Sequence, residues 1–193
     1  KKVSMERKAL TVLFFTLVLD MIGIGMVIPI IPIIFTDPTS PSFLLTGIDQ
    51  KYWYFLAGVT TALFGIMQFF TAPILGELSD IYGRKKLLFL GVFVLALSQC
   101  IFGLGIITKS LTLILVSRFV GGLAAANFSI AQASIADVST PEHRARNFGL
   151  IGAAFGIGFV VGPALSGYLA HFFHSASAPF WVAGALGGIN MLS

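Results

Sequence analysis

The residue of this sequence best suited to chemistry is Asp20, a carboxylate inside a long apolar run. It stands about twelve residues into a predicted helix over 9–35, hence roughly 18 Å along that helix at 1.5 Å per residue. A carboxylate at the centre of a membrane costs about 2.5–3.5 kcal/mol on insertion scales, so its presence favours a functional role. Asp20 could bind a substrate or carry a proton. The alternative is a hydrogen bond that only packs two helices together.

A second charge, Arg118, lies within the predicted helix over 111–136. It could act within the span, or it could extend its side chain to the lipid headgroups. Asn127 and Gln132 follow it in a run of small residues. Close helix packing explains the small residues but not the amides, so both are candidates for the wall of a polar cavity, as is Gln68.

Glycines mark two further segments. Residues 76–86 connect two predicted helices, and we expect Gly76 and Gly83 to permit a tight turn there, with Asp80 capping or accepting from a helix amino terminus and basic residues from Arg84 on. Gly158, Gly162 and Pro163 lie within the predicted helix over 147–170. Four-residue glycine spacing allows close helix approach, and the Gly-Pro step predicts a bend.

The elements that must position these residues are transmembrane helices. The chain has 193 residues, of which 56% are hydrophobic and 10% charged, whereas a soluble domain carries about 25% charged residues. A span needs roughly 20 apolar residues. The sequence predicts one all-α domain over 1–193 with helices over about 9–35, 52–76, 87–107, 111–136, 147–170 and 179–193. We expect the last helix to be truncated.

The basic residues predict the orientation. With the amino terminus in the cytoplasm, nine of the twelve lysines and arginines lie on the inner side and only Lys51 and Lys109 on the outer side. The nine are Lys1, Lys2, Arg7, Lys8, Arg84, Lys85, Lys86, Arg144 and Arg146. The sequence therefore predicts a multi-pass protein of the plasma membrane, or inner membrane in a bacterium, surrounded by lipid.

Several classes of function find no support in the sequence. There is no glycine-rich nucleotide loop and no nucleophile triad, so we do not expect an enzyme. The net charge of +4 does not indicate a nucleic-acid partner either, because the location of the basic residues matters more than their sum. His171 and His174 lack a third ligand, so no metal site is expected. The only coupling species expected is the proton.

Four segments resemble the major facilitator superfamily, and within it drug exporters of the tetracycline/proton antiporter type. They are Leu19-Asp20-x-x-Gly23-x-Gly25-x-x-x-Pro29-x-x-Pro32, Gly76-x-Leu-Ser-Asp80-x-x-Gly83-Arg84-Lys85, Arg118-x-x-Gly-Gly122 and Gly158-x-x-x-Gly162-Pro163-x-x-Ser-Gly167. Two positions depart from the family pattern: Ile81 replaces a basic residue and Ser166 replaces a glycine.

The resemblance implies a fold and a mechanism. The chain would be the amino-terminal six-helix half of a twelve-helix transporter, built from two inverted three-helix repeats. Asp20 would bind substrate or proton, Arg118 would tune it, and Asp80 and Arg84 would latch the inner gate. The expected substrate is a small amphipathic or cationic drug or a metabolite. The partner is a second six-helix half or a second copy of the chain, and the remaining alternative is a transport-inactive receptor or assembly subunit.

Overall fold

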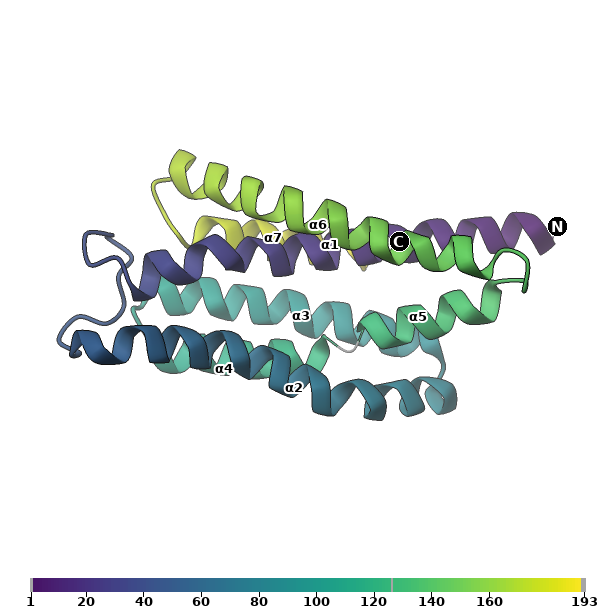
Figure 1. Ribbon diagram of the computed structural model, residues 1–193, viewed down its shortest axis with the longest axis horizontal. Helices are drawn as coiled ribbons and strands as arrows, with labels where there is room; N and C mark the ends of the chain where they lie inside the picture. The colour runs from purple at the N-terminus through teal and green to yellow at the C-terminus, as the bar shows by residue number, and fades with distance from the viewer. Residues whose placement is uncertain (1, 126, 192–193) are drawn as a thin grey trace.

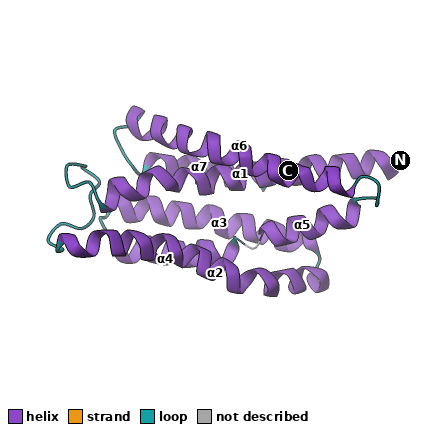
Figure 2. Ribbon diagram, viewed as in Figure 1, coloured by secondary structure: helices purple, strands orange, loops and turns teal. Residues whose placement is uncertain are grey.

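The structure is a computed structural model that describes residues 2–125 and 127–191, with side chains from residue 10 on. The described residues are helical or in connections, and none forms a strand (Figure 2). The elements are α1 (Lys2–Phe35), the short 3-10 helix η1 (Gln50–Tyr52), α2 (Trp53–Tyr82), α3 (Arg84–Ile107), α4 (Leu111–Ala124), α5 (Asn127–Val138), α6 (Arg144–Phe172) and α7 (Ala178–Asn190).

Five helical stretches are long and apolar enough to cross a membrane. They cover Leu10–Phe35, Gln50–Tyr82, Arg84–Ile107, Leu111–Val138 and Arg144–Phe172. The fourth stretch contains α4 and α5, where the sequence predicted one helix. With α7, the bundle has the six-helix order expected from the sequence.

The helices lie side by side along the long axis of the molecule (Figure 1). The α2–α3 turn and the α5–α6 loop lie at one end, which we call the turn end. The long α1–α2 loop and the α3–α4 and α6–α7 connections lie at the other, which we call the loop end. The basic residues that begin α3 and α6 are therefore at the turn end, whereas Lys51 and Lys109 are at the loop end.

Glycines allow α1 and α6 to approach until their backbones touch. A Cβ atom added at Gly25 would lie 2.7 Å from the Gly158 carbonyl oxygen, and one added at Gly162 would lie 2.8 Å from the Ile22 carbonyl oxygen. Ser166 on α6 donates a hydrogen bond to the Met26 carbonyl oxygen of α1 over 2.8 Å. Ser166, one of the two residues that depart from the family pattern, therefore forms a hydrogen bond between α6 and α1.

Large apolar side chains cover the outward faces of α2 and α6. Phe55, Phe69 and Phe70 on α2 are each more than 60% exposed, as are Val160 and Tyr168 on α6. Soluble monomers rarely expose so much contiguous apolar surface, so we expect lipid or a packed partner to cover these faces. The buried apolar core lies between the helices, with Phe35, Phe102 and Phe180 fully enclosed near the loop end.

The α2–α3 turn differs from its prediction. Helix α2 continues through Gly76 and Asp80 to Tyr82, so Gly76 forms no part of the turn. Gly83 alone makes it, with a φ of 95° that a side chain would strain. The capping role predicted for Asp80 was wrong, because no side chain caps the amino terminus of α3. Asp80 instead pairs with Arg84, four residues on.

Candidate transport site

Asp20 lies in the interior of the bundle, where only 8% of it is exposed. Its carboxylate accepts a hydrogen bond from the Asn127 amide, at 3.4 Å between Nδ2 and Oδ2. Asn127 is the first residue of α5 and is itself 2% exposed. The sequence singled out both residues, and the fold brings them together across 107 positions.

Arg118 is buried on α4, with 4% of the residue exposed. One terminal nitrogen donates to the Gln99 side-chain oxygen over 3.2 Å. The guanidinium carbon lies 4.5 Å from the ring centroid of Phe102 and 5.4 Å from that of Phe64. Such cation–π contacts stabilise a cation withdrawn from water. Arg118 therefore points into the bundle, and the alternative that it reaches the headgroups is wrong.

Asp20 and Arg118 are both buried but do not pair directly. None of the ion pairs among the described residues joins them. Gln99 on α3 lies between them, since it binds Arg118 and its amide nitrogen donates to the Gly23 carbonyl oxygen of α1 over 3.0 Å. Gly23 is three residues after Asp20, about one turn along α1, so the network of Arg118 and Gln99 ends beside the segment that carries the carboxylate.

Glycines make room for the two amides of this network. A Cβ atom at Gly91 of α3 would lie 1.9 Å from the Asn127 side-chain oxygen. At Gly23 an added Cβ would lie 3.3 Å from the Gln99 amide nitrogen. The amide of Asn127 therefore occupies the space that a side chain at Gly91 would fill.

The other predicted cavity-wall residues, Gln68 and Gln132, lie on α2 and α5. Gln68 on α2 donates to the Ala125 carbonyl oxygen over 3.2 Å, at the end of α4. Gln132 is half-buried on α5. The fold therefore joins Asp20 to Asn127, and Arg118 to Gln99, but gives Gln68 a separate role between α2 and α4.

A cluster of charges fixes the turn end. Arg84 contacts Asp80 over 2.9 Å and Asp137 of α5 over 2.5 Å, and one of its terminal nitrogens lies 3.4 Å from the Ser79 hydroxyl. Asp137 was not singled out in the sequence, although it is a carboxylate near the end of a predicted span. Its partner is 53 residues away, so only the fold shows the contact.

The predicted moving residues of α6 lie against α1. Gly158 faces Met21, the neighbour of Asp20, and Gly162 faces Gly25. The Pro163 ring lies beside Gly25, with its Cδ 3.2 Å from where a Cβ would stand. These contacts place Gly158, Gly162 and Pro163 behind the α1 segment that carries Asp20.

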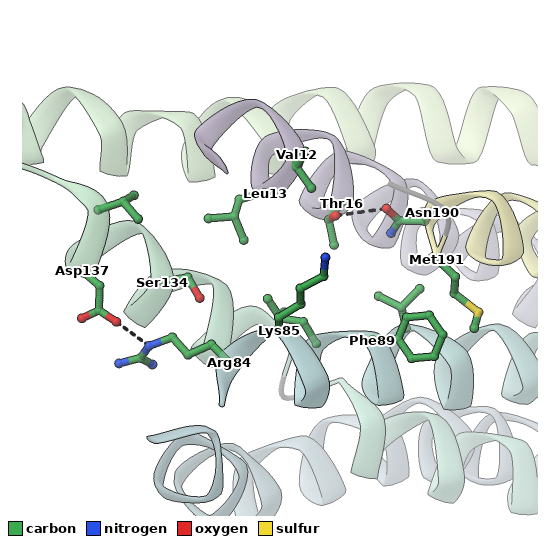
Figure 3. A pocket seen from close by; sticks show the side chains of 13 residues that line it. Val12, Leu13, Thr16, Arg84, Lys85, Phe89, Ser134, Asp137, Asn190 and Met191 are labelled. Atoms are coloured by element: carbon green, nitrogen blue, oxygen red, sulfur yellow. Dashed lines mark hydrogen bonds and ion pairs between the residues drawn. The ribbon is translucent and has the colours of Figure 1, made fainter. Parts of the chain in front are cut away.

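Two cavities adjoin the network. A cavity of about 20 Å³ is lined by Asp20, Gly23 and Gln99, together with residues of α7. A larger one of about 500 Å³ lies nearer the turn end, and Val92 lines both. Figure 3 shows the larger cavity between α1, α3, α5 and α7, with Lys85 extending toward the hydrogen bond of Thr16 to Asn190.

This six-helix arrangement, with charged and amide side chains buried inside its spans, defines half of a transporter bundle. Residues 13–193 match the Major Facilitator Superfamily, and the chain belongs to that family. It is therefore a multi-pass membrane protein of a transporter family and not an enzyme. The fold class expected from the sequence is confirmed.

Named relatives make the likeness more specific. The chain is 38% identical over 187 residues to the class C tetracycline resistance protein of Escherichia coli, covering 97% of this chain and 44% of that protein. It is 33% identical over 181 residues to the quinolone resistance protein NorA of Staphylococcus aureus, covering 93% of this chain and 42% of NorA. The chain thus spans less than half the length of these relatives.

A solved structure matches the fold. The crystal structure of the human organic anion transporter MFSD10 (TETRAN) superimposes with a TM-score of 0.78 at 28% sequence identity. The match covers 97% of this chain and 46% of that transporter. Drug-resistance proteins and an organic anion transporter therefore share this half-bundle.

Proposed function

We propose that this chain forms one half of a proton-coupled antiporter that exports small amphipathic or cationic drugs across the plasma membrane by alternating access. The observation that carries the proposal is the Asp20 carboxylate, buried mid-span with one amide partner. The tetracycline and quinolone resistance relatives support the substrate class. Because the chain spans under half of them, the rest of the site would come from a second six-helix half or a second copy.

Asp20 has the properties that a shared proton and substrate site requires. When ionised, it accepts from Asn127; when protonated, it carries no charge and its hydroxyl needs an acceptor. A cationic substrate would favour the ionised form and a proton the neutral form. The two ligands would therefore compete for one carboxylate, which couples export of one to entry of the other.

The remaining predicted residues take supporting roles in this proposal. Arg118, Gln68, Asn127 and Gln132 would shape the polar wall around the carboxylate. Gly76, Asp80, Gly83 and Arg84 would form the inner latch, and Gly158, Gly162 and Pro163 would accommodate tilting of α6. The turn end would face the cytoplasm together with the amino terminus, because the basic residues of α3 and α6 gather there.

The test measures substrate-driven proton movement in inverted membrane vesicles from cells that make the full polypeptide. A pH-sensitive dye reports proton release when tetracycline or a quinolone is added. We expect Asp20→Asn to abolish this signal, while Asp37→Asn, which changes a half-buried carboxylate in the loop after α1, retains it.

Full proton flux with Asp20→Asn would remove Asp20 from the mechanism. Drug binding by the unaltered protein with no proton flux would instead indicate a receptor or assembly subunit.

A further inference from the structure

Gln99 is a buried amide on α3 to which the proposed transport mechanism assigns no role. Only 4% of it is exposed, within a helix that is otherwise mostly apolar. An amide in a membrane helix must find partners for both its donor and its acceptor, because lipid supplies none. Gln99 finds them on two different helices.

The two ends of the Gln99 amide bind in opposite directions. Its oxygen accepts from the Arg118 guanidinium of α4 over 3.2 Å, and its nitrogen donates to the Gly23 carbonyl oxygen of α1 over 3.0 Å. Gly23 has no side chain, and a Cβ atom there would lie 3.3 Å from that nitrogen. Arg118 therefore binds the oxygen of this amide, and the absence of a side chain at Gly23 leaves room for its nitrogen.

None of the ion pairs among the described residues gives the Arg118 guanidinium a carboxylate partner. Its Nε has no hydrogen-bond partner among the described residues. Phe102 and Phe64 present their ring faces to it. A buried cation strongly favours a carboxylate, so its contact with a neutral amide leaves it able to change partner.

We infer that Gln99 is a positioning residue, which holds the Arg118 guanidinium apart from the Asp20 carboxylate and so sets how readily Asp20 exchanges its proton. The inference rests on the proposed proton-coupled function. It assigns to α3 a part in coupling that neither the charged residues nor the glycine pattern indicated.

Few other charges can affect this network. Among the described residues, the buried charged side chains are Asp20 of α1 and Arg118 of α4. Cys100 follows Gln99 in the sequence and can also titrate, and its sulfur packs against Gly184 of α7. The residue that reaches Asp20 from α5 is the neutral Asn127. The α7 residues that share a cavity with Gln99 are Ala183 and Gly187, which do not titrate.

The small cavity beside Gln99 adds a route between the amide and the carboxyl group. Its volume of about 20 Å³ exceeds the 10–15 Å³ or so that one water molecule requires. Asp20 and Gln99 both line it and supply the polar partners that a buried water needs. A water molecule there could bridge Gln99 and Asp20 by hydrogen bonds, so that the orientation of the amide affects the carboxyl group without a direct contact.

The experiment follows the protonation of Asp20 itself by infrared spectroscopy of the full polypeptide reconstituted in lipid. The stretching band of a protonated carboxyl group is titrated with pH and assigned to Asp20 by its loss in Asp20→Asn. Gln99→Met keeps the length of the side chain but removes both hydrogen bonds. Arg118 can then approach Asp20, and we expect the midpoint of the band to fall by about one pH unit or more.

Gln99→Glu should move the midpoint the other way. The new carboxylate would bind Arg118 in an ion pair and place a negative charge near Asp20, so we expect the midpoint to rise. This opposite sign is the result that a merely structural role of Gln99 would not produce. The Glu variant also decides the matter if the Met variant does not fold.

Ser98→Ala is the matched control, since Ser98 is fully buried on the same helix but donates only to its own helix, at Leu95. We expect it to leave the midpoint unchanged. The inference is overturned if either Gln99 variant folds and titrates as Ser98→Ala does. Because the infrared measurement needs no transport, it is independent of the vesicle experiment, and either proposal can fail alone.

Discussion

Arg84 and Arg118 differ in their partners: Arg84 pairs with carboxylates, whereas Arg118 binds an amide. At the turn end, Arg84 pairs directly with Asp80 and Asp137, whose side chains are 64% and 58% exposed. In the interior, Arg118 and Asp20 are both more than 90% buried, and each bonds to an amide instead. The exposed charges are paired, and the buried ones are kept apart.

The difference has a physical reason. Exposed ion pairs contribute only about 0–1 kcal/mol each, because water competes for both partners. They can therefore form and break at little cost. A buried ion pair is far harder to break, since removing one partner leaves an uncompensated charge at about 3–5 kcal/mol. Neutral amide partners avoid the cost of breaking a buried ion pair, so the carboxylate could still bind a proton or a cation.

Among variants of the buried network, Gly91→Ala is expected to have the largest effect. The added methyl group would collide with the Asn127 side-chain oxygen and displace the amide from Asp20. Overpacking of this kind costs about 1–3 kcal/mol. We expect a lower thermal unfolding midpoint of the purified protein together with weaker proton-coupled transport.

Gly149→Ala on α6 is the control for this variant, because a Cβ atom there meets nothing within 4 Å. Alanine in place of a helical glycine adds about 0.5–1 kcal/mol of stability. Opposite signs for the two variants are the expected result. If Gly91→Ala were also stabilising, Asn127 would not depend on that space.

A smaller effect is expected at the turn end, from a double-mutant cycle of Arg84→Ala and Asp137→Ala. Because the carboxylate is exposed, the coupling energy should be about 0.2–1 kcal/mol and should decrease as salt is added. The measurement is the free energy of unfolding of the four proteins. A salt-independent coupling above this range would mean that water does not reach the pair.

The smallest effect is expected from Asp37 in the loop after α1. A hydrogen bond from the Thr39 hydroxyl, with one from its backbone amide, lowers the pKa of Asp37 below its ordinary value of 3.8. A lowered folded-state pKa stabilises the fold above the unfolded pKa, and this contribution is lost as pH falls through the folded pKa.

Asp37→Asn should therefore destabilise the protein slightly near neutral pH and converge with the unaltered protein in acid. Thermal unfolding midpoints measured from neutral pH down to about 2 test this. A difference that does not change with pH would contradict it.

The sequence predicted the bundle and its charged interior, because Asp20 and Arg118 stand out in apolar runs whatever their partners are. It did not predict Gln99 or Gly91. An amide or a glycine within a span has no distinctive spacing, and its importance depends on how each helix is rotated toward its neighbours. Asp137 was missed for a similar reason: its contact with Arg84 depends on where α5 ends relative to the α2–α3 turn.

The turn itself shows the limit of local patterns. Two glycines seven positions apart predicted a turn between them, but helical hydrogen bonds continue through Gly76, and only Gly83 adopts a backbone conformation outside the helix. Glycine permits a turn without requiring one. Tertiary packing of α2 decides how far that helix extends.

The close contact of α1 with α6 has a mechanical consequence. Where Gly25, Gly158 and Gly162 bring the two backbones into contact, no flexible side chain separates the two helices. Neither helix can slide along the other by a fraction of a turn without a collision, so we expect α1 and α6 to move as one rigid unit. Any tilt that Pro163 allows in α6 is then transmitted to α1 at Met21, one residue from Asp20.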